Sequence, residues 1–220
     1  FIATKIAVGQ LSPNTVVWLR FALGIPLIFV AVLLRKQFAF PKGREWLYFA
    51  LLGFLGISFH QWLQSNGLKT AQATTTAWII TTAPAFIAIL GWLALKEKLL
   101  FHQWLGIGLA TLGVLAVVTK GDWAALAVGN FGTKGDFLIL ISAVNWAVFS
   151  ILSRYGLKRH PSTRVTFWMM ALGWVFTSVA FAASGKYTEI LQLDLRGWLV
   201  IIYLGIFTTG LAYIAWFSAL

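Results

Sequence analysis

Residues 15–34 read TVVWLRFALGIPLIFVAVLL, a continuous stretch in which Arg20 is the one charged side chain. A helix rises 1.5 Å per residue, so a stretch of this length covers the roughly 30 Å of hydrocarbon in a bilayer. The stretch is apolar throughout and lacks the period-two alternation of a barrel strand, which favours a helix. We therefore interpret it as a membrane-spanning helix.

Outward from this stretch, the same pattern recurs along the chain, separated by short polar loops. We expect an all-α polytopic membrane protein with seven full spans and a partial first span at residues 1–8. The expected full spans are Thr15–Leu34, Glu45–Leu68, Ala73–Leu95, His102–Thr119, Gly135–Gly156, Arg164–Ser184 and Arg196–Ser218. Pro26 and Pro84 fall inside spans, where a missing backbone donor can kink a helix.

The composition agrees with a bilayer environment. Hydrophobic residues make up 60% of the chain and charged residues 10%, whereas soluble domains carry about 25% charged residues. The formal charge of +11 can indicate nucleic-acid binding, but here the basic residues lie between apolar runs, so we expect no nucleic-acid partner. Cysteine is absent and the three histidines lie in separate elements, so we expect no metal and no cofactor.

The basic residues of the loops predict the orientation of the spans. Alternate loops carry ten basic residues against five, and the positive-inside rule places the richer set in the cytoplasm. The N-terminus is then cytoplasmic, and we expect a multi-pass protein of the cell's inner (plasma) membrane. The richer set is Arg35, Lys36, Lys42, Arg44, Lys96, Lys98, Arg154, Lys158, Arg159 and Arg164.

The opening stretch is repeated later in the chain. Shifted by 149 positions, residues 22–24 (ALG) meet 171–173 (ALG); shifted by 152, Arg44-x-Trp46-Leu47 meets Arg196-x-Trp198-Leu199. Five spans separate the copies, and this odd number inverts the second copy in the membrane. Inverted repeats are typical of secondary transporters. We expect a ten-span inverted 5+5 bundle, represented here by a first repeat at 1–120 whose first span is incomplete and a second repeat at 135–220 lacking its last two spans.

Several motifs follow one another in a specific order. They are GLKTAQA at 67–73, APAF at 83–86, LKEKL at 95–99, GIGL at 106–109 and NWA at 145–147, followed by Ser153-Arg154. This series resembles EamA-type members of the drug/metabolite transporter superfamily. The family pattern has a small-residue turn, a span with a central proline, a Gly-Glu-Arg/Lys-Leu corner and a glycine-rich span. Lys96 stands where that corner usually has glycine.

The resemblance implies a secondary transporter, and no enzyme, that moves small organic metabolites such as amino acids by alternating access, commonly as an exporter. Its partners would be a small-molecule solute and the lipid bilayer; the oligomeric state stays open. A nucleotide-sugar or other anionic-metabolite exchanger is the alternative, although only Lys5 and Arg20 come near the buried cations it would need. A non-transport scaffold and an intramembrane enzyme are further alternatives, and His60 is the one titratable group at depth that such an enzyme offers.

Polar and aromatic side chains inside spans are the candidates for a solute site, because they need partners in the protein or in a wet cavity. The repeat places Gln61 and Tyr213 at equivalent depths, so both are expected to line the cavity. The remaining candidates for substrate binding are Asn145, Trp146, Trp78, Thr82 and His60. Lys5 and Arg20 lie near span ends and are expected to snorkel, or else to attract an anionic group.

Overall fold

The structure is a computed structural model that describes residues 1–124 and 132–219. Within these ranges every regular element is helical. The elements are α1 (Ile2–Gln10), α2 (Pro13–Leu34), α3 (Glu45–Gly53), η1 (Phe54–Phe59), α4 (His60–Thr70), α5 (Ala73–Ile80), α6 (Ala83–Leu95), α7 (Phe101–Val118), α9 (Lys134–Leu157), α10 (Ser162–Ser184), α11 (Thr188–Leu191), α12 (Leu195–Tyr203), η2 (Leu204–Leu211) and α13 (Ala212–Ala219).

In the part of the chain that the structure describes, seven helical segments are long and apolar enough to cross a membrane, which confirms the all-α polytopic fold. They are Pro13–Leu34, Glu45–Thr70, Ala73–Leu95, Phe101–Val118, Lys134–Leu157, Ser162–Ser184 and Leu195–Ala215. Their bounds differ from those expected from the sequence by a few residues at most. The ten-span layout and the bounds of the two repeats stay predictions.

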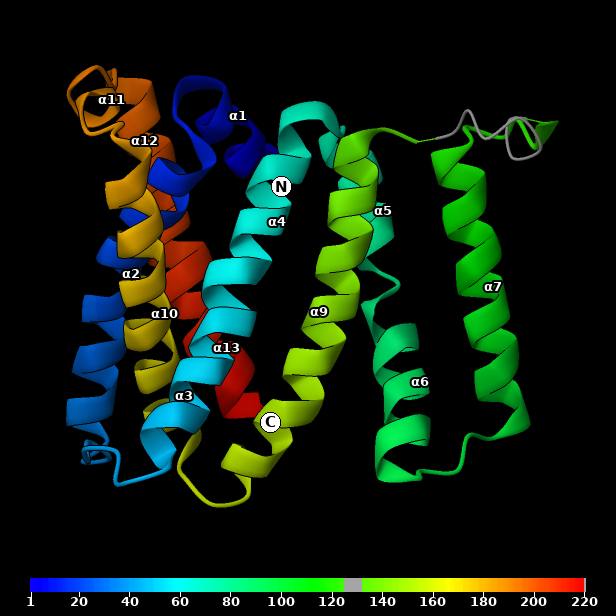
Figure 1. Ribbon diagram of the computed structural model, residues 1–220, viewed down its shortest axis with the longest axis horizontal. Coiled ribbons are helices and arrows are strands. Elements are labelled where there is room, and N and C mark those ends of the chain that lie inside the picture. The colour runs from blue at the N-terminus through cyan, green and yellow to red at the C-terminus, as the bar shows by residue number, and fades with distance from the viewer. Residues whose placement is uncertain (125–131, 220) are drawn as a thin grey trace.

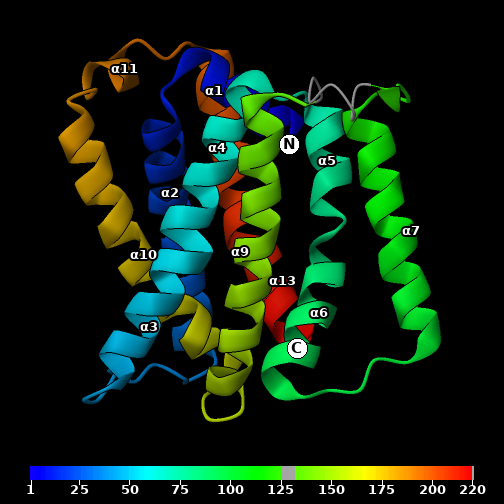
Figure 2. The ribbon, with the colours of Figure 1, turned by 45° about the vertical axis from the view of Figure 1, so that its right-hand side comes forward.

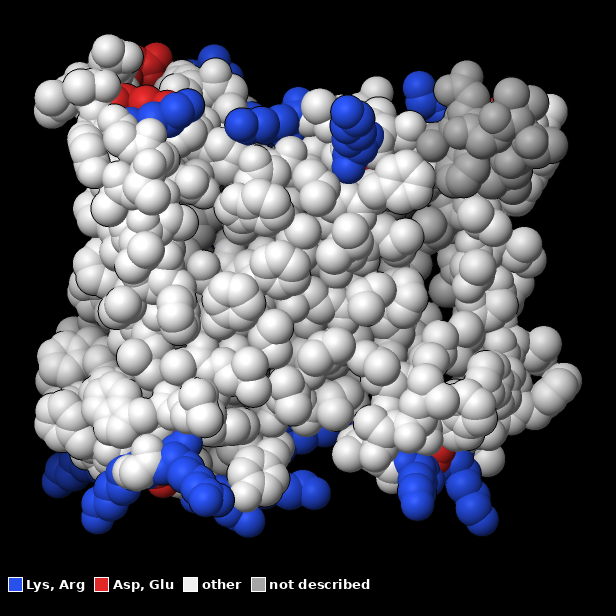
Figure 3. All heavy atoms as spheres, in the orientation of Figure 1, with Lys and Arg blue, Asp and Glu red and all other residues white. Residues whose placement is uncertain are grey.

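The spans run alternately up and down, as Figures 1 and 2 show. Loops 35–44, 96–100 and 158–161 lie at one end of the bundle, which we call the basic end. Figure 3 shows lysine and arginine side chains at both ends of this face and a band free of charge between them. This arrangement matches a bilayer, in which charged side chains are costly at mid-depth.

The two copies of the repeat lie in opposite directions. Helix α2 descends toward the basic end while α10 ascends from it, and α3–α4 ascends while α12–α13 descends (Figure 1). Both of the latter spans contain a π-helical segment, η1 at Phe54–Phe59 and η2 at Leu204–Leu211, and the shift of 152 places the two segments over one another. A shared irregularity at matched positions supports a common origin of the two spans.

Helices of the two copies cross where the repeated glycines lie. A Cβ added to Gly53 would lie 2.5 Å from the Met169 carbonyl oxygen and 2.6 Å from the Gly173 nitrogen. At the equivalent crossing, a Cβ on Gly205 would lie 2.6 Å from the Leu23 Cβ. Only glycine allows backbones this close, so α3 packs against α10 just as α12–η2 packs against α2.

The span Ala73–Leu95 is broken near its middle. Helix α5 ends at Ile80 and α6 begins at Ala83, with Pro84 in the first turn of α6. Proline lacks the N–H that would continue the ladder. The hydroxyls of Thr81 and Thr82 bond back to carbonyls of their own helix at 2.6 Å each. Pro26, in contrast, lies inside α2 without ending it.

Candidate solute cavity

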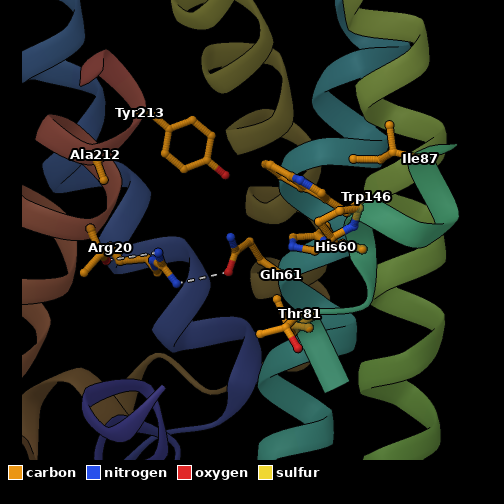
Figure 4. A pocket seen from close by; sticks show the side chains of 12 residues that line it. Arg20, His60, Gln61, Thr81, Ile87, Trp146, Ala212 and Tyr213 are labelled. Atoms are coloured by element: carbon orange, nitrogen blue, oxygen red, sulfur yellow. Dashed lines mark hydrogen bonds between the residues drawn. The ribbon is translucent and has the colours of Figure 1, made fainter. Parts of the chain in front are cut away.

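A central cavity of ≈600 Å³ lies between α2, α4, the α5–α6 break, α9 and the η2–α13 span. This volume is in the range of pockets that hold small organic ligands. Figure 4 shows the lining side chains converging from these elements, which are far apart in sequence. The lining residues are Arg20, His60, Gln61, Ile80, Thr81, Ala83, Pro84, Ile87, Trp146, Thr208, Ala212 and Tyr213.

Arg20 and Gln61 form the polar centre of this cavity. The Arg20 Nη1 donates to Gln61 Oε1 at 3.0 Å, Nε donates to the Thr209 hydroxyl at 3.0 Å, and Nη2 donates to the Thr208 hydroxyl at 3.2 Å. Arg20 and Gln61 are both buried, each with 6% of its surface exposed. In Figure 4 the Tyr213 hydroxyl points toward the Gln61 amide. One cluster thus joins three spans inside the bundle.

His60 and Trp146 form the opposite wall. The His60 Nδ1 lies 3.2 Å from the Ser142 carbonyl oxygen, and its ring packs on Trp146 with centroids 4.9 Å apart. A carbonyl can only accept, so Nδ1 carries the proton in this contact and fixes the ring orientation. Trp146 also packs against Phe149, with centroids 4.9 Å apart. The wall is therefore aromatic and held in place by α9.

Two further cavities flank the central one. The first, ≈460 Å³ and on the side away from the basic end, is lined by Thr4, Gln64 and Thr74 among others. It shares Arg20, Gln61 and Thr208 with the central cavity. The second, ≈620 Å³ at the basic end, shares Ile87 with the central cavity. The Arg20 cluster thus lies between the central cavity and the flanking cavity away from the basic end.

An ion pair lines the basic-end cavity. Glu97, after α6, accepts a hydrogen bond from Arg154 of α9 at 3.1 Å, so it links the two halves of the chain. The preceding residue, Lys96, has a left-handed backbone with φ 56°. Glycine adopts this conformation without strain, which explains the glycine of the family pattern at this corner.

The structure brings four of the seven predicted site residues together around the cavity: Gln61, Tyr213, His60 and Trp146. Asn145 instead donates to the Leu55 carbonyl at 2.7 Å, within the η1 segment. Trp78 is 61% exposed, and Thr82 is buried against its own helix; neither lines the cavity. A role in solute binding stays a prediction for all seven.

Sequence reasoning misplaced Arg20. The expectation that it snorkels to the membrane surface is wrong, because its guanidinium turns inward to Gln61, Thr208 and Thr209. Lys5, in contrast, extends to the end of the bundle away from the basic end, as a snorkelling side chain would, and its Nζ donates there to carbonyls around the end of α4, including Ala71 at 2.7 Å. One signal for Arg20 was available: it lies one turn before Gly24, on the face of α2 that packs against η2.

The profile of the EamA-like transporter family matches residues 1–119 and 133–220. An uncharacterized transporter of Archaeoglobus fulgidus (strain ATCC 49558) is 28% identical over 100% of this chain and 74% of its own. The uncharacterized transporter YdfC of Bacillus subtilis (strain 168) is 30% identical over 93% of this chain and 64% of its own. YyaM, another uncharacterized transporter of that organism, is 27% identical over 98% and 71%.

One solved crystal structure shares the fold. The two structures superpose over 96% of this chain and 71% of the other chain, with a TM-score of 0.62 and 20% sequence identity. At that identity the likeness concerns the arrangement of the helices alone. The family profile and the transporters similar in sequence indicate a multi-pass membrane transporter rather than an enzyme.

Proposed function

The chain belongs to the EamA-like transporter family, and from this premise we propose that it carries small organic metabolites, such as amino acids, across the plasma membrane by alternating access, in the direction of export. The basic end would face the cytoplasm, in accordance with the positive-inside rule. The observation that carries the proposal is the central cavity, which is large enough for such a solute and lined by Gln61 and Tyr213 from the two repeats.

Alternating access is supported by the inverted arrangement of the spans and by the three cavities. Secondary transporters with inverted repeats place the solute near the bilayer midplane, and each half moves against the other around it. Here the Arg20 cluster lies on one side of the central cavity, and Ile87 lies on the other. Movement at either boundary would connect the central cavity to one end at a time.

The broken span Ala73–Leu95 offers a place for such movement. Between α5 and α6, Thr81 lines the cavity while its hydroxyl bonds to its own helix. Irregular backbone at membrane depth is tolerated where it lines a cavity. A hinge at this break would let α6, which ends at the Glu97–Arg154 ion pair, move relative to α5.

The proposal is tested by making the intact protein in a bacterial strain and measuring efflux of, and resistance to, a panel of amino acids and related metabolites. We expect export of particular solutes, weakened at least tenfold in Gln61→Ala and Tyr213→Phe. Asn66→Ala is the matched control, because Asn66 is a half-buried amide on the same helix as Gln61 that donates to the Trp62 carbonyl of that helix and does not line the cavity. The reasoning fails if a folded protein exports no panel member, or if both cavity variants export with unchanged rate and apparent affinity.

A further inference from the structure

The Arg20 guanidinium is a buried positive charge without a carboxylate partner. Its hydrogen-bond partners are an amide oxygen and two hydroxyl oxygens, and its Cζ lies 5.5 Å from the centroid of the Phe21 ring; all of these groups are neutral. A buried charge is costly unless it is paired, and in a membrane such residues are almost always functional or paired with one another. The neutral partners orient the guanidinium but leave its charge uncompensated.

All six carboxylates of the chain lie in the described ranges, and each is engaged elsewhere. Glu45 pairs with Arg164, Glu97 with Arg154 and Glu189 with Lys186. Asp122, Asp136 and Asp194 accept backbone N–H groups near helix ends. Within the described chain, therefore, the charge of Arg20 has no internal counterion.

The helix crossing itself does not require this charge. The shift of 149 pairs Arg20 with Met169, which is fully buried at the equivalent crossing of α10 and α3–η1. At that crossing, Gly56 and Ile57 occupy the positions that correspond, under the shift of 152, to Thr208 and Thr209. The same packing is thus built once from apolar residues and once around an arginine held by two hydroxyls. Of these two crossings, the one built around Arg20 lines the central cavity, and the apolar one does not.

The guanidinium also keeps hydrogen-bond donors for a ligand. Three of its five N–H donors are used in the contacts above, one on each nitrogen, which leaves one N–H on each Nη among the described residues. A guanidinium N–H forms a strong, charge-assisted hydrogen bond to a carboxylate oxygen. The rest of the cavity lining contains no Lys and no second Arg, so the site balances one negative charge.

We propose that Arg20 is the solute-binding residue for a carboxylate, and that the cavity selects metabolites bearing this group with at most one net negative charge. The proposal rests on the proposed function, which it makes more specific. Gln61, Thr208 and Thr209 position the guanidinium. A nucleotide sugar, with its two phosphate charges, fits this single cation poorly.

The test uses a matched pair of thiol reagents that differ only at the group in question. Iodoacetate carries a carboxylate and iodoacetamide a neutral amide, and both alkylate a cysteine sulfur with loss of iodide. Ala212 lines the same cavity and is drawn beside Arg20 in Figure 4. The chain contains no cysteine, so Ala212→Cys places a single thiol there, with any cysteine outside these residues replaced by serine.

We expect the iodoacetate-to-iodoacetamide rate ratio at Ala212→Cys to exceed that of free N-acetylcysteine in the same buffer by at least tenfold. Arg20→Met, which copies the natural Met169, should remove this excess, while Arg20→Lys should keep part of it through its charge. Met169→Leu, at the equivalent crossing, should leave it unchanged. An equal ratio in the protein and the free thiol, or an excess that survives Arg20→Met, overturns the proposal.

Two controls keep the result interpretable. Monodisperse elution of each variant and an unchanged iodoacetamide rate show that Arg20→Met is folded; if it is not, Arg20→Gln takes its place. The labelling does not depend on transport, so the carrier proposal can fail while carboxylate recognition stands. Conversely, export of solutes without a carboxylate that is unaffected by Arg20→Met would retain the carrier and refute carboxylate selection.

Discussion

Adding a single methyl group at the glycine crossings should destabilise the bundle, and the two crossings should differ in a defined way. In Gly53→Ala, the new Cβ meets two backbone atoms of α10, the Met169 oxygen at 2.5 Å and the Gly173 nitrogen at 2.6 Å. In Gly205→Ala, it meets the Leu23 Cβ at 2.6 Å, and the nearest backbone atom, the Arg20 oxygen, is 3.2 Å away.

The size of the effect follows from these distances. Ordinary carbon contacts begin near 3.4 Å, so Gly53→Ala requires α3 and α10 to separate by about 0.9 Å, and backbone atoms cannot rotate away. Overpacking of this kind costs about 1–3 kcal/mol. We expect the free energy of unfolding to fall by about 2–3 kcal/mol in Gly53→Ala, where two contacts are under 3.0 Å, and by about 1–2 kcal/mol in Gly205→Ala, where one contact is.

The assay is thermal unfolding of the purified intact protein in detergent, followed by tryptophan fluorescence. Gly9→Ala is the control, because a Cβ at that helical position meets nothing within 4 Å, and alanine there should leave stability unchanged or raise it by up to about 1 kcal/mol. From highest to lowest melting temperature, the expected order is Gly9→Ala, Gly205→Ala and Gly53→Ala. Coincident melting of Gly53→Ala and Gly9→Ala would refute the close crossing.

Three further substitutions test other parts of the fold in the same unfolding assay. Lys96→Gly should raise stability by about 1 kcal/mol, since it relieves the left-handed φ of 56°, while Lys96→Ala should not. Tyr48→Phe should lower stability by about 1–2 kcal/mol, because its hydroxyl donates to a carbonyl and accepts an N–H of α9 at 2.8 Å each; an unchanged melt contradicts this. Partial burial raises the pKa of Glu189, but hydrogen bonds from Ser12 and Thr15 outweigh it and hold that pKa below its usual value. Glu189→Gln should therefore lower stability by about 1 kcal/mol at pH 7, and the difference should be full above about pH 4.3 and vanish as pH falls through the folded pKa; a difference that grows in acid contradicts the assignment.

The spans could be predicted from the sequence because membrane insertion depends mainly on length and hydropathy, both local properties. The break before Pro84 also followed from local chemistry, since proline cannot donate to the helix ladder. The inverted direction of the copies followed from counting spans between repeated motifs. The π-helical segments did not, because their extra residue per turn is set by packing against neighbouring helices and carries no sequence signature of its own.

The cavity was only partly predictable. Gln61 and Tyr213 were identified because the repeat gave them equal depth. Arg20 lies near a span end, which predicts either snorkelling or attraction of an anionic group; position along the span cannot tell which face of the helix the side chain occupies. Asn145 was placed in the cavity because it is a mid-span amide; in the structure that amide satisfies the Leu55 carbonyl of η1, a partner that exists only once the π-helical segment has formed.

The central claim is that the cavity opens to the two sides of the membrane in turn. Thr74 lines the flanking cavity away from the basic end, and Ser150 lines the basic-end cavity. Single cysteines at these two positions of the intact protein would be labelled with a soluble maleimide, with and without a solute identified in the efflux panel. The account predicts that the solute changes the two labelling rates in opposite directions. Rates that rise or fall together, or that do not respond to a transported solute, would contradict it.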